Sequence, residues 1–281
     1  MLEYLAAIIA FFSIYRGMTI IMKKHMDYNP KKFMREARPI YLKMGKNGVL
    51  LIHGFTSSPH ELRDLAKYFA KKGLTVYAPL LKGHGTSPEN LATTNDEDWI
   101  KSAEEGLTKL NKECKQVFIV GNSLGGNIAM CLAAKHKIRG LVLLAPPLIF
   151  KKERLFKAIY HIIRLMKDFQ KKWKHKTMKN LKPRKGHYEK IPLNTLKYVT
   201  KTVRNSKLAL SRITVPTLLM QSTNDVWSDE RSVNYVVKNI RSKDMKVVWI
   251  NDVYHVFIME KDNKNYIQYI YRFINENMKK R

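Results

Sequence analysis

The chain has 281 residues, which suits one large α/β domain or a domain with an insertion, and its 45% hydrophobic content favours a packed core over disorder. The net charge of +29 indicates attraction to anionic surfaces such as nucleic acid, acidic lipid headgroups or charged substrates, although a lysine-rich but otherwise ordinary surface explains it equally well. Two cysteines, Cys114 and Cys131, are too few for a disulfide framework and favour a reducing compartment.

The first predicted element is an almost continuous apolar run at residues 4–22. At about 1.5 Å per residue it would just cross a bilayer core of about 30 Å. Arg16 opposes a membrane span, and the absence of a cation before the run and of an A-x-A site after it opposes a cleavable signal peptide. We interpret residues 1–25 as a signal anchor or interfacial helix. A buried helix or strand of the domain is the alternative. The basic residues that follow would keep the catalytic part in the cytoplasm.

From residue 48 onward, short apolar runs alternate with longer amphipathic ones. We expect strands at 49–53, 74–79, 116–120, 140–146, 214–222 and 245–251, and helices at 59–73, 95–113, 124–137, 228–240 and 261–280. This alternation predicts an α/β fold with a doubly wound, mostly parallel sheet that helices cover on both faces. The predicted core comprises residues 45–147 and 213–281.

Residues 148–212 interrupt this pattern with 20 lysines and arginines against three acidic residues. Apolar residues recur there at helical spacing: Leu155, Phe156, Ile159, Tyr160, Ile162, Ile163, Met166, Phe169 and Trp173. The spacing predicts an amphipathic helix with a basic far side. We interpret the segment as a basic helical cap, or lid, inserted after a core strand. A helical excursion with a solvated face is the alternative.

Ser123 lies in the pattern Gly-Asn-Ser-Leu-Gly at residues 121–125, between a predicted strand and a predicted helix. This is the context of a nucleophile elbow, a turn so tight that the residues two before and two after the serine must be small. Gly121 and Gly125 meet that requirement. The serine oxygen would then lie at the N-terminus of the following helix, where the helix dipole and free N–H groups favour an oxyanion.

A serine hydroxyl needs a base, and in this architecture an acid and then a histidine follow it along the chain. Asp225 and His255 each come directly after a predicted strand, at the end where open α/β sheets build their sites. The rival acids are Asp229, which we expect to cap the next helix, and Asp252, which is too near His255 along one loop. We therefore predict Ser123, Asp225 and His255 as the catalytic residues.

Two backbone N–H groups are expected to bind the oxyanion, one from Phe55 after the early strand and one from Leu124 after the nucleophile. Gly54 would let the backbone approach the substrate oxygen. We interpret His53 as a structural residue that braces this loop, and His84 as structural too. No histidine spacing is typical of a zinc site, so we expect neither a metal nor an organic cofactor.

The motifs HGFTSSP, APLLKGHGTSPENL and VGNSLGG, with ND at Asp225 and YHV at His255, resemble the bacterial carboxylesterase and monoacylglycerol lipase branch of the α/β-hydrolases. The resemblance runs from about residue 48 to the C-terminus. It implies the α/β-hydrolase fold, a helical cap, and the same triad and oxyanion donors. Three features depart from the family: Asn122, where an apolar residue is common, the lysine-rich cap, and the apolar N-terminal segment.

These observations predict a hydrolase of carboxylic esters that works through an acyl-enzyme. Candidate substrates are a monoacylglycerol, a lysophospholipid or a short-chain ester, and transfer of the acyl group to another alcohol would use the same residues. The competing hypothesis is a non-catalytic protein that binds anionic membranes or polyanions through its basic cap. Few aromatic residues are interleaved with that charge, so no nucleic-acid partner is expected. The sequence leaves the oligomeric state open.

Overall fold

The computed structural model describes residues 33–151, 163, 167–172, 181, 185–251 and 253–280. The predicted N-terminal anchor, most of the predicted cap helix and Asp252 lie outside these residues. Within them, no helix has both the length and the apolar character that a membrane crossing needs. Both cysteines are free thiols.

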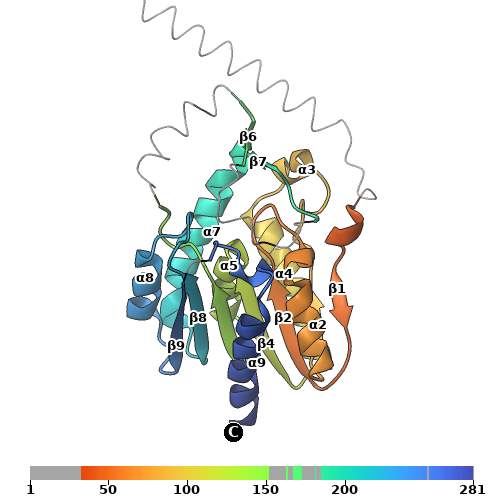
Figure 1. Cartoon of the computed structure of the whole chain (residues 1–281), viewed down its shortest axis with the longest axis vertical. Helices are drawn as coiled ribbons and strands as arrows, with labels where there is room; N and C mark the ends of the chain where they lie inside the picture. Colours follow the sequence, from red (N-terminus) through yellow and green to blue (C-terminus); the bar gives the residue numbers. More distant parts are fainter. Residues whose placement is uncertain are drawn as a thin grey trace, which may run out of the picture.

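A seven-stranded sheet forms the centre of the described structure (Figure 1). Its strands lie in the order β1 (Ile40–Leu42), β3 (Thr75–Ala78), β2 (Asn47–Ile52), β4 (Gln116–Asn122), β5 (Gly140–Leu144), β8 (Thr217–Ser222) and β9 (Met245–Ile250). Strand β1 pairs antiparallel with β3, and all other neighbours are parallel. The sheet is therefore mostly parallel, as predicted. The expectation missed β1, because three residues are too few to show a periodic pattern.

Two layers of helices cover the sheet and bury alternate strand residues. Leu51 of β2 belongs to a core with α2 (Arg63–Lys71) and α9 (Lys264–Lys279), whereas Leu50 belongs to a core on the other face. That second core includes residues of α4 (Asp96–Glu113), α5 (Leu124–Ala133), α7 (Leu196–Ala209) and α8 (Arg231–Asn239). Apolar side chains on both faces of buried parallel strands explain why these strands read as continuous apolar runs.

Local sequence signals place the helix starts. At α4, the Asn95 side chain accepts a hydrogen bond from the Asp98 N–H at 3.0 Å, and the Asp98 carboxylate accepts one from the Asn95 N–H at 3.2 Å. This capping box satisfies two N–H groups that would otherwise lack partners. The predicted helix at 59–73 begins instead as a 3-10 turn, η2 (Pro59–Leu62), and becomes α-helical only at Arg63.

The described part of the segment between β5 and β8 contains two short strands that the sequence analysis does not predict. Strands β6 (Phe169–Lys171) and β7 (Lys190–Pro192) pair antiparallel, so Phe169, which was expected to be helical, lies in a strand. Pairing with a segment about 20 residues away supplies backbone hydrogen bonds that the helical spacing did not anticipate. Helix α7 then packs on α5, where Asn127 Nδ2 donates to Ser206 Oγ at 2.9 Å.

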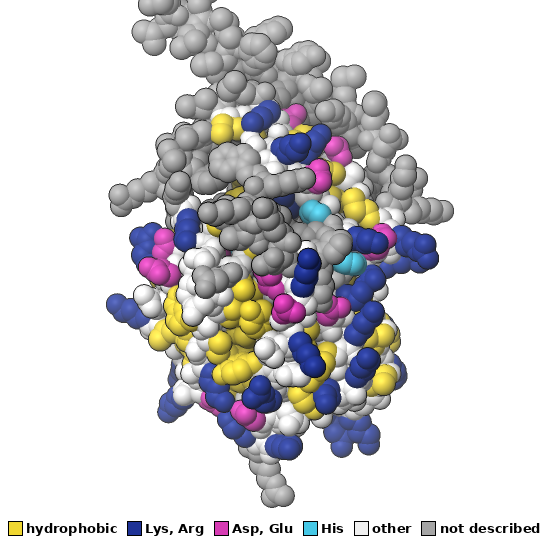
Figure 2. All heavy atoms as spheres, in the orientation of Figure 1, with side chains coloured by type: hydrophobic (Ala, Val, Ile, Leu, Met, Phe, Trp, Pro, Cys, Tyr) yellow, Lys and Arg dark blue, Asp and Glu magenta, His cyan; other side chains and the backbone are white. Residues whose placement is uncertain are grey.

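The positive charge of the chain is dispersed over the visible face of the molecule. In Figure 2, lysine and arginine side chains are scattered among acidic and apolar ones. Several of them pair with acids, as Lys82 does with Asp98 and Lys246 does with Glu276. On this face the described residues thus form no single cationic patch.

Candidate active site

The turn between β4 and α5 has the geometry of a nucleophile elbow. Ser123 adopts φ 53° and ψ −120°, a backbone conformation that L-residues rarely occupy. A Cβ on Gly121 would lie 2.2 Å from the Gly125 carbonyl oxygen, and one on Gly125 would lie 2.2 Å from the Ile52 oxygen. Close backbone contact therefore requires glycine at both positions, which are the positions where a nucleophile elbow needs small residues.

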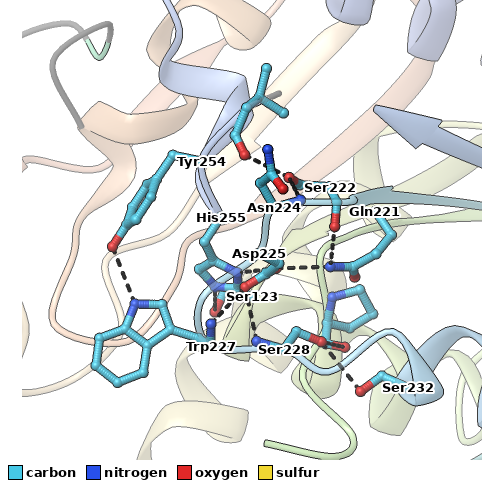
Figure 3. A network of polar contacts seen from close by, with 12 residues as sticks. Ser123, Gln221, Ser222, Asn224, Asp225, Trp227, Ser228, Ser232, Tyr254 and His255 are labelled. Atoms are coloured by element: carbon cyan, nitrogen blue, oxygen red, sulfur yellow. Dashed lines mark hydrogen bonds and ion pairs between the residues drawn. The ribbon is translucent and has the colours of Figure 1, made fainter. Parts of the chain in front are cut away.

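The structure brings Ser123, His255 and Asp225 into one hydrogen-bonded chain (Figure 3). Ser123 Oγ lies 2.8 Å from His255 Nε2, and His255 Nδ1 lies 2.5 Å from Asp225 Oδ2. Asp225 and His255 are buried, whereas Ser123 is partly exposed. The two loops meet because they follow β8 and β9, which are parallel neighbours that end at the same edge of the sheet.

Four donors hold the Asp225 carboxylate. Oδ1 accepts from the backbone N–H groups of Trp227 at 2.8 Å and Ser228 at 2.9 Å, and Oδ2 accepts from Gln221 Nε2 at 2.8 Å in addition to His255. Burial by itself would raise the pKa of Asp225. The charge and hydrogen bond of His255 and the two backbone donors outweigh burial, so this pKa lies below its usual value. The carboxylate is thus kept ionised beside the imidazole.

The sequence predicts no role for Gln221, because this residue lies within the apolar strand β8. Its side chain is fully buried and aims at Asp225 (Figure 3). The available signal was a single amide inside an apolar strand, four residues before the candidate acid. Nearby, the Ser222 hydroxyl donates to the Val253 carbonyl at 2.6 Å and accepts from the Asn224 N–H at 3.1 Å. These contacts tie the loop of Asp225 to the loop of His255.

His53 makes two hydrogen bonds to the loops around it. Its Nε2 accepts from the Leu81 N–H at 3.1 Å, so Nδ1 carries the proton and donates to the Gly54 carbonyl at 2.9 Å. Burial lowers the pKa of His53, which keeps this ring neutral. The Ser57 N–H donates to the same carbonyl at 3.2 Å. Because the peptide is planar, fixing the Gly54 carbonyl also fixes the direction of the Phe55 N–H.

The two expected oxyanion donors flank the serine. A Cβ on Gly54 would lie 3.4 Å from the Ser123 Cβ, so the loop that carries the Phe55 N–H lies against the nucleophile. Leu124 is the first residue of α5. Within the described part of the chain, neither the Phe55 nor the Leu124 N–H donates to another group. Both are therefore available to a ligand atom beside Ser123 Oγ.

The remaining candidates take up supporting positions. His84 is buried with its ring centroid 5.1 Å from that of His53, and burial together with the neighbouring His53 holds the pKa of His84 well below its usual value. The sequence predicts Asp229 as the cap of α8, but the N-cap residue of this helix is Glu230. Asp229 Oδ1 accepts from the N–H of Arg231, the first residue of α8, at 3.0 Å. Among the residues that the structure describes, no group of three or more His, Cys, Asp or Glu side chains could hold a metal ion.

Comparison with known proteins identifies the family. Residues 45–262 match the family described as serine aminopeptidase, S33. A carboxylesterase of Bacillus subtilis is 29% identical over 85% of this chain and 96% of its own length, and a thermostable monoacylglycerol lipase of Bacillus sp. (strain H-257) is 32% identical over 83% and 92%.

A solved structure from a study of the metagenome-derived lipolytic enzymes LipS and LipT superposes with a TM-score of 0.80 at 25% identity, over 87% of this chain and 99% of that one. The matches span nearly the full length of these proteins and most of the described chain. The chain therefore belongs to the serine aminopeptidase S33 family and is an α/β-hydrolase of the carboxylesterase and monoacylglycerol lipase type, a group of carboxylic ester hydrolases.

Proposed function

We propose that this protein hydrolyses carboxylic esters, with Ser123 as nucleophile, His255 as general base and then general acid, and Asp225 as the residue that orients the imidazole. The observation that carries the proposal is the unbroken chain from Ser123 Oγ through both nitrogens of His255 to Asp225 Oδ2. The partly exposed serine and the buried acid suit their separate tasks, because substrate must reach only the first.

The reaction proceeds in two halves. Ser123 Oγ attacks the ester carbonyl carbon while its proton passes to His255 Nε2, and the carbonyl oxygen becomes an oxyanion. Asp225 stabilises the imidazolium through Nδ1–H. When the tetrahedral intermediate collapses, the bond to the alcohol breaks and Nε2 returns the proton to the leaving oxygen. Water then attacks the acyl-enzyme by the same route, which releases the acid and restores Ser123.

The backbone N–H groups of Phe55 and Leu124 form the proposed oxyanion hole. Support comes from the Gly54 peptide, whose carbonyl is held on the opposite side by His53, and from the position of Leu124 at the start of α5. Such donors act where charge develops in the transition state, and each is worth about 2.7–4 kcal/mol of barrier.

We further propose that residues 148–212 form a cap over the site. Two contacts of Tyr188 support this placement. Its N–H donates to the carbonyl of Thr56, next to Phe55, at 2.9 Å, and its hydroxyl donates to the Gly83 carbonyl at 2.8 Å. The segment around Tyr188 thus contacts the loop that carries the first proposed oxyanion donor. A cap anchored here would border the acyl or alcohol side of the substrate.

The substrate class follows from the relatives, which include a carboxylesterase and a monoacylglycerol lipase. We propose small or lipid monoesters as substrates. The test is hydrolysis of p-nitrophenyl esters from acetate to palmitate by the purified chain and by its Ser123→Ala variant. Ser242→Ala is the serine control, because the Ser242 hydroxyl donates to the Asp244 carbonyl ahead of β9 and takes no part in the loops of the triad. We expect activity that disappears only in Ser123→Ala, and the chain-length optimum distinguishes esterase from lipase. Equal activity in Ser123→Ala would refute the proposal.

A further inference from the structure

A buried carboxylate lies behind the elbow, and the reaction described above does not use it. Glu61, in η2, is only 5% exposed. Its Oε1 accepts two hydrogen bonds, one from the Gly54 N–H at 2.6 Å and one from Asn122 Nδ2 at 2.9 Å. Both donors are buried as well. Asn122 is one of the features in which this sequence departs from the family, where an apolar residue is common at this position.

The two donors belong to the two segments that carry the proposed oxyanion hole. Gly54 directly precedes Phe55, and Asn122 lies two residues before Leu124 with Ser123 between them. One carboxylate oxygen therefore joins the loop after β2 to the elbow after β4. The three groups lie side by side, since a Cβ on Gly54 would be in van der Waals contact, at 3.4 Å, with Glu61 Oε1, the Asn122 carbonyl oxygen and the Ser123 Cβ.

We propose that Glu61 is a positioning residue that sets the spacing between the Phe55 and Leu124 N–H groups, with Asn122 as its partner on the elbow. The inference rests on the proposed ester hydrolysis and deepens it. The two peptide units that flank the Gly54 Cα are then both held: Glu61 accepts from the Gly54 N–H, and His53 and Ser57 donate to the Gly54 carbonyl, whose peptide unit carries the Phe55 N–H. Hydrogen-bond donors stabilise a developing oxyanion when their positions are fixed. Removing the hydrogen bonds to Glu61 should therefore lower kcat more than it raises KM.

The negative charge of Glu61 is not what the site requires. A carboxylate near a developing oxyanion opposes its formation, because like charges repel strongly at short range in a dry site. What matters is an acceptor oxygen with two lone pairs, which a glutamine side chain also supplies. Glu61→Gln should therefore preserve the function of the residue.

The experiment compares Glu61→Gln with Glu61→Leu in the full chain and measures kcat and KM for a p-nitrophenyl ester. Inhibition by an alkyl boronic acid, which forms a tetrahedral adduct with an active-site serine, is the second readout. We expect Glu61→Leu to lower kcat by about tenfold to 100-fold, with KM changed by less than about threefold. The boronate inhibition constant should rise by the same factor, and Glu61→Gln should stay within about threefold of the parent chain.

Asp96→Leu is the matched control. Asp96 is also a buried carboxylate, 1% exposed, but it pairs with Lys201 at 3.1 Å between α4 and α7, away from the elbow. This variant should lower the melting temperature and leave kcat unchanged. If Glu61→Leu does not fold, Asn122→Leu removes only one of the two donors and should give a smaller loss of kcat with the same unchanged KM.

Two results would overturn the inference. One is a folded Glu61→Leu or Asn122→Leu variant with full kcat and an unchanged boronate inhibition constant. The other is a Glu61→Gln variant as impaired as Glu61→Leu, which would show that charge rather than the acceptor oxygen is needed. Failure of the proposed function is a separate outcome, recognised when the parent chain has no esterase activity or when Ser123→Ala retains it.

Discussion

The two halves of the site are built in different ways. The elbow around Ser123 is local: one strand, one pentapeptide and one helix place the serine, and two glycines make the turn sterically feasible. The pair of Asp225 and His255 is assembled from two loops 30 residues apart, which side-chain and backbone hydrogen bonds hold together. Changes at the two elbow glycines should therefore act on folding, whereas changes at the acid–histidine pair should act on chemistry and leave the fold intact.

The largest effect is expected at the elbow glycine. Gly125→Ala places a Cβ 2.2 Å from the Ile52 oxygen, in backbone that cannot move aside. We expect a loss of several kcal/mol in the free energy of unfolding, or no folded protein. Gly73→Ala is the control, because Gly73 has φ 81° but nothing within 4 Å of its Cβ position, so it should cost only about 1 kcal/mol. Urea unfolding of both variants measures the difference. Equal, small losses would contradict the steric account of the elbow.

The second effect is on chemistry alone. Asp225→Asn keeps the size of the side chain but cannot stabilise the imidazolium, and it favours the wrong tautomer of His255. We expect kcat to fall by about 10⁴-fold with the melting temperature nearly unchanged. Asp229→Asn alters the rival acid, whose carboxylate bonds Arg231 at the start of α8, and should leave kcat as it is. A large loss in Asp229→Asn together with none in Asp225→Asn would reassign the acid.

The third prediction concerns the buried histidines beside the elbow. Burial lowers the pKa of His53 and holds that of His84 far below its usual value, so both are neutral in the folded state. The unfolded chain binds protons below about pH 6.5, and stability is therefore lost over the acidic interval that begins at about pH 6.5. Each ring contributes up to about 1.4 kcal/mol per pH unit to this slope.

His84→Gln tests that sign directly. The free energy of unfolding of this variant should vary less with pH over that interval than the free energy of the parent chain, as urea titrations at several pH values would reveal. A slope that is unchanged by the substitution would show that His84 is already protonated in the fold, contrary to its burial.

The smallest predicted loss of kcat concerns a residue that supports the acid–histidine pair. Gln221→Leu removes one of the four donors to Asp225 while preserving the bulk of a fully buried side chain. Because both backbone N–H donors and His255 remain, we expect kcat to fall only by about threefold to tenfold. The Gln221 carbonyl oxygen has no partner among the described residues, so its removal should not destabilise the fold. A loss as large as that in Asp225→Asn would mean that Gln221, and not the loop backbone, orients the acid.

The difference between the local elbow and the acid–histidine pair, which is assembled from two loops, also explains which parts of the site the sequence could predict. The sequence predicts the elbow because its strand, its pentapeptide and the start of its helix all lie within residues 117–130. It predicts the acid and the histidine because their chain order and strand-end positions are constrained. The tie from Glu61 to Asn122 and the bond from Gln221 to Asp225 were missed, since neither contact leaves a periodic or motif signal. Phe169 was misplaced for a related reason: its strand partner is remote in sequence, and local spacing favoured a helix.

The central claim is that Ser123 forms the covalent intermediate. Brief reaction of the chain with a p-nitrophenyl ester, followed by acid quenching and mass spectrometry of the peptides, tests it directly. We expect one acyl group, on the peptide that contains Ser123, and none there in Ser123→Ala. Hydrolysis that proceeds at the full rate with the acyl group on another residue, or with none trapped at any time, would contradict the account.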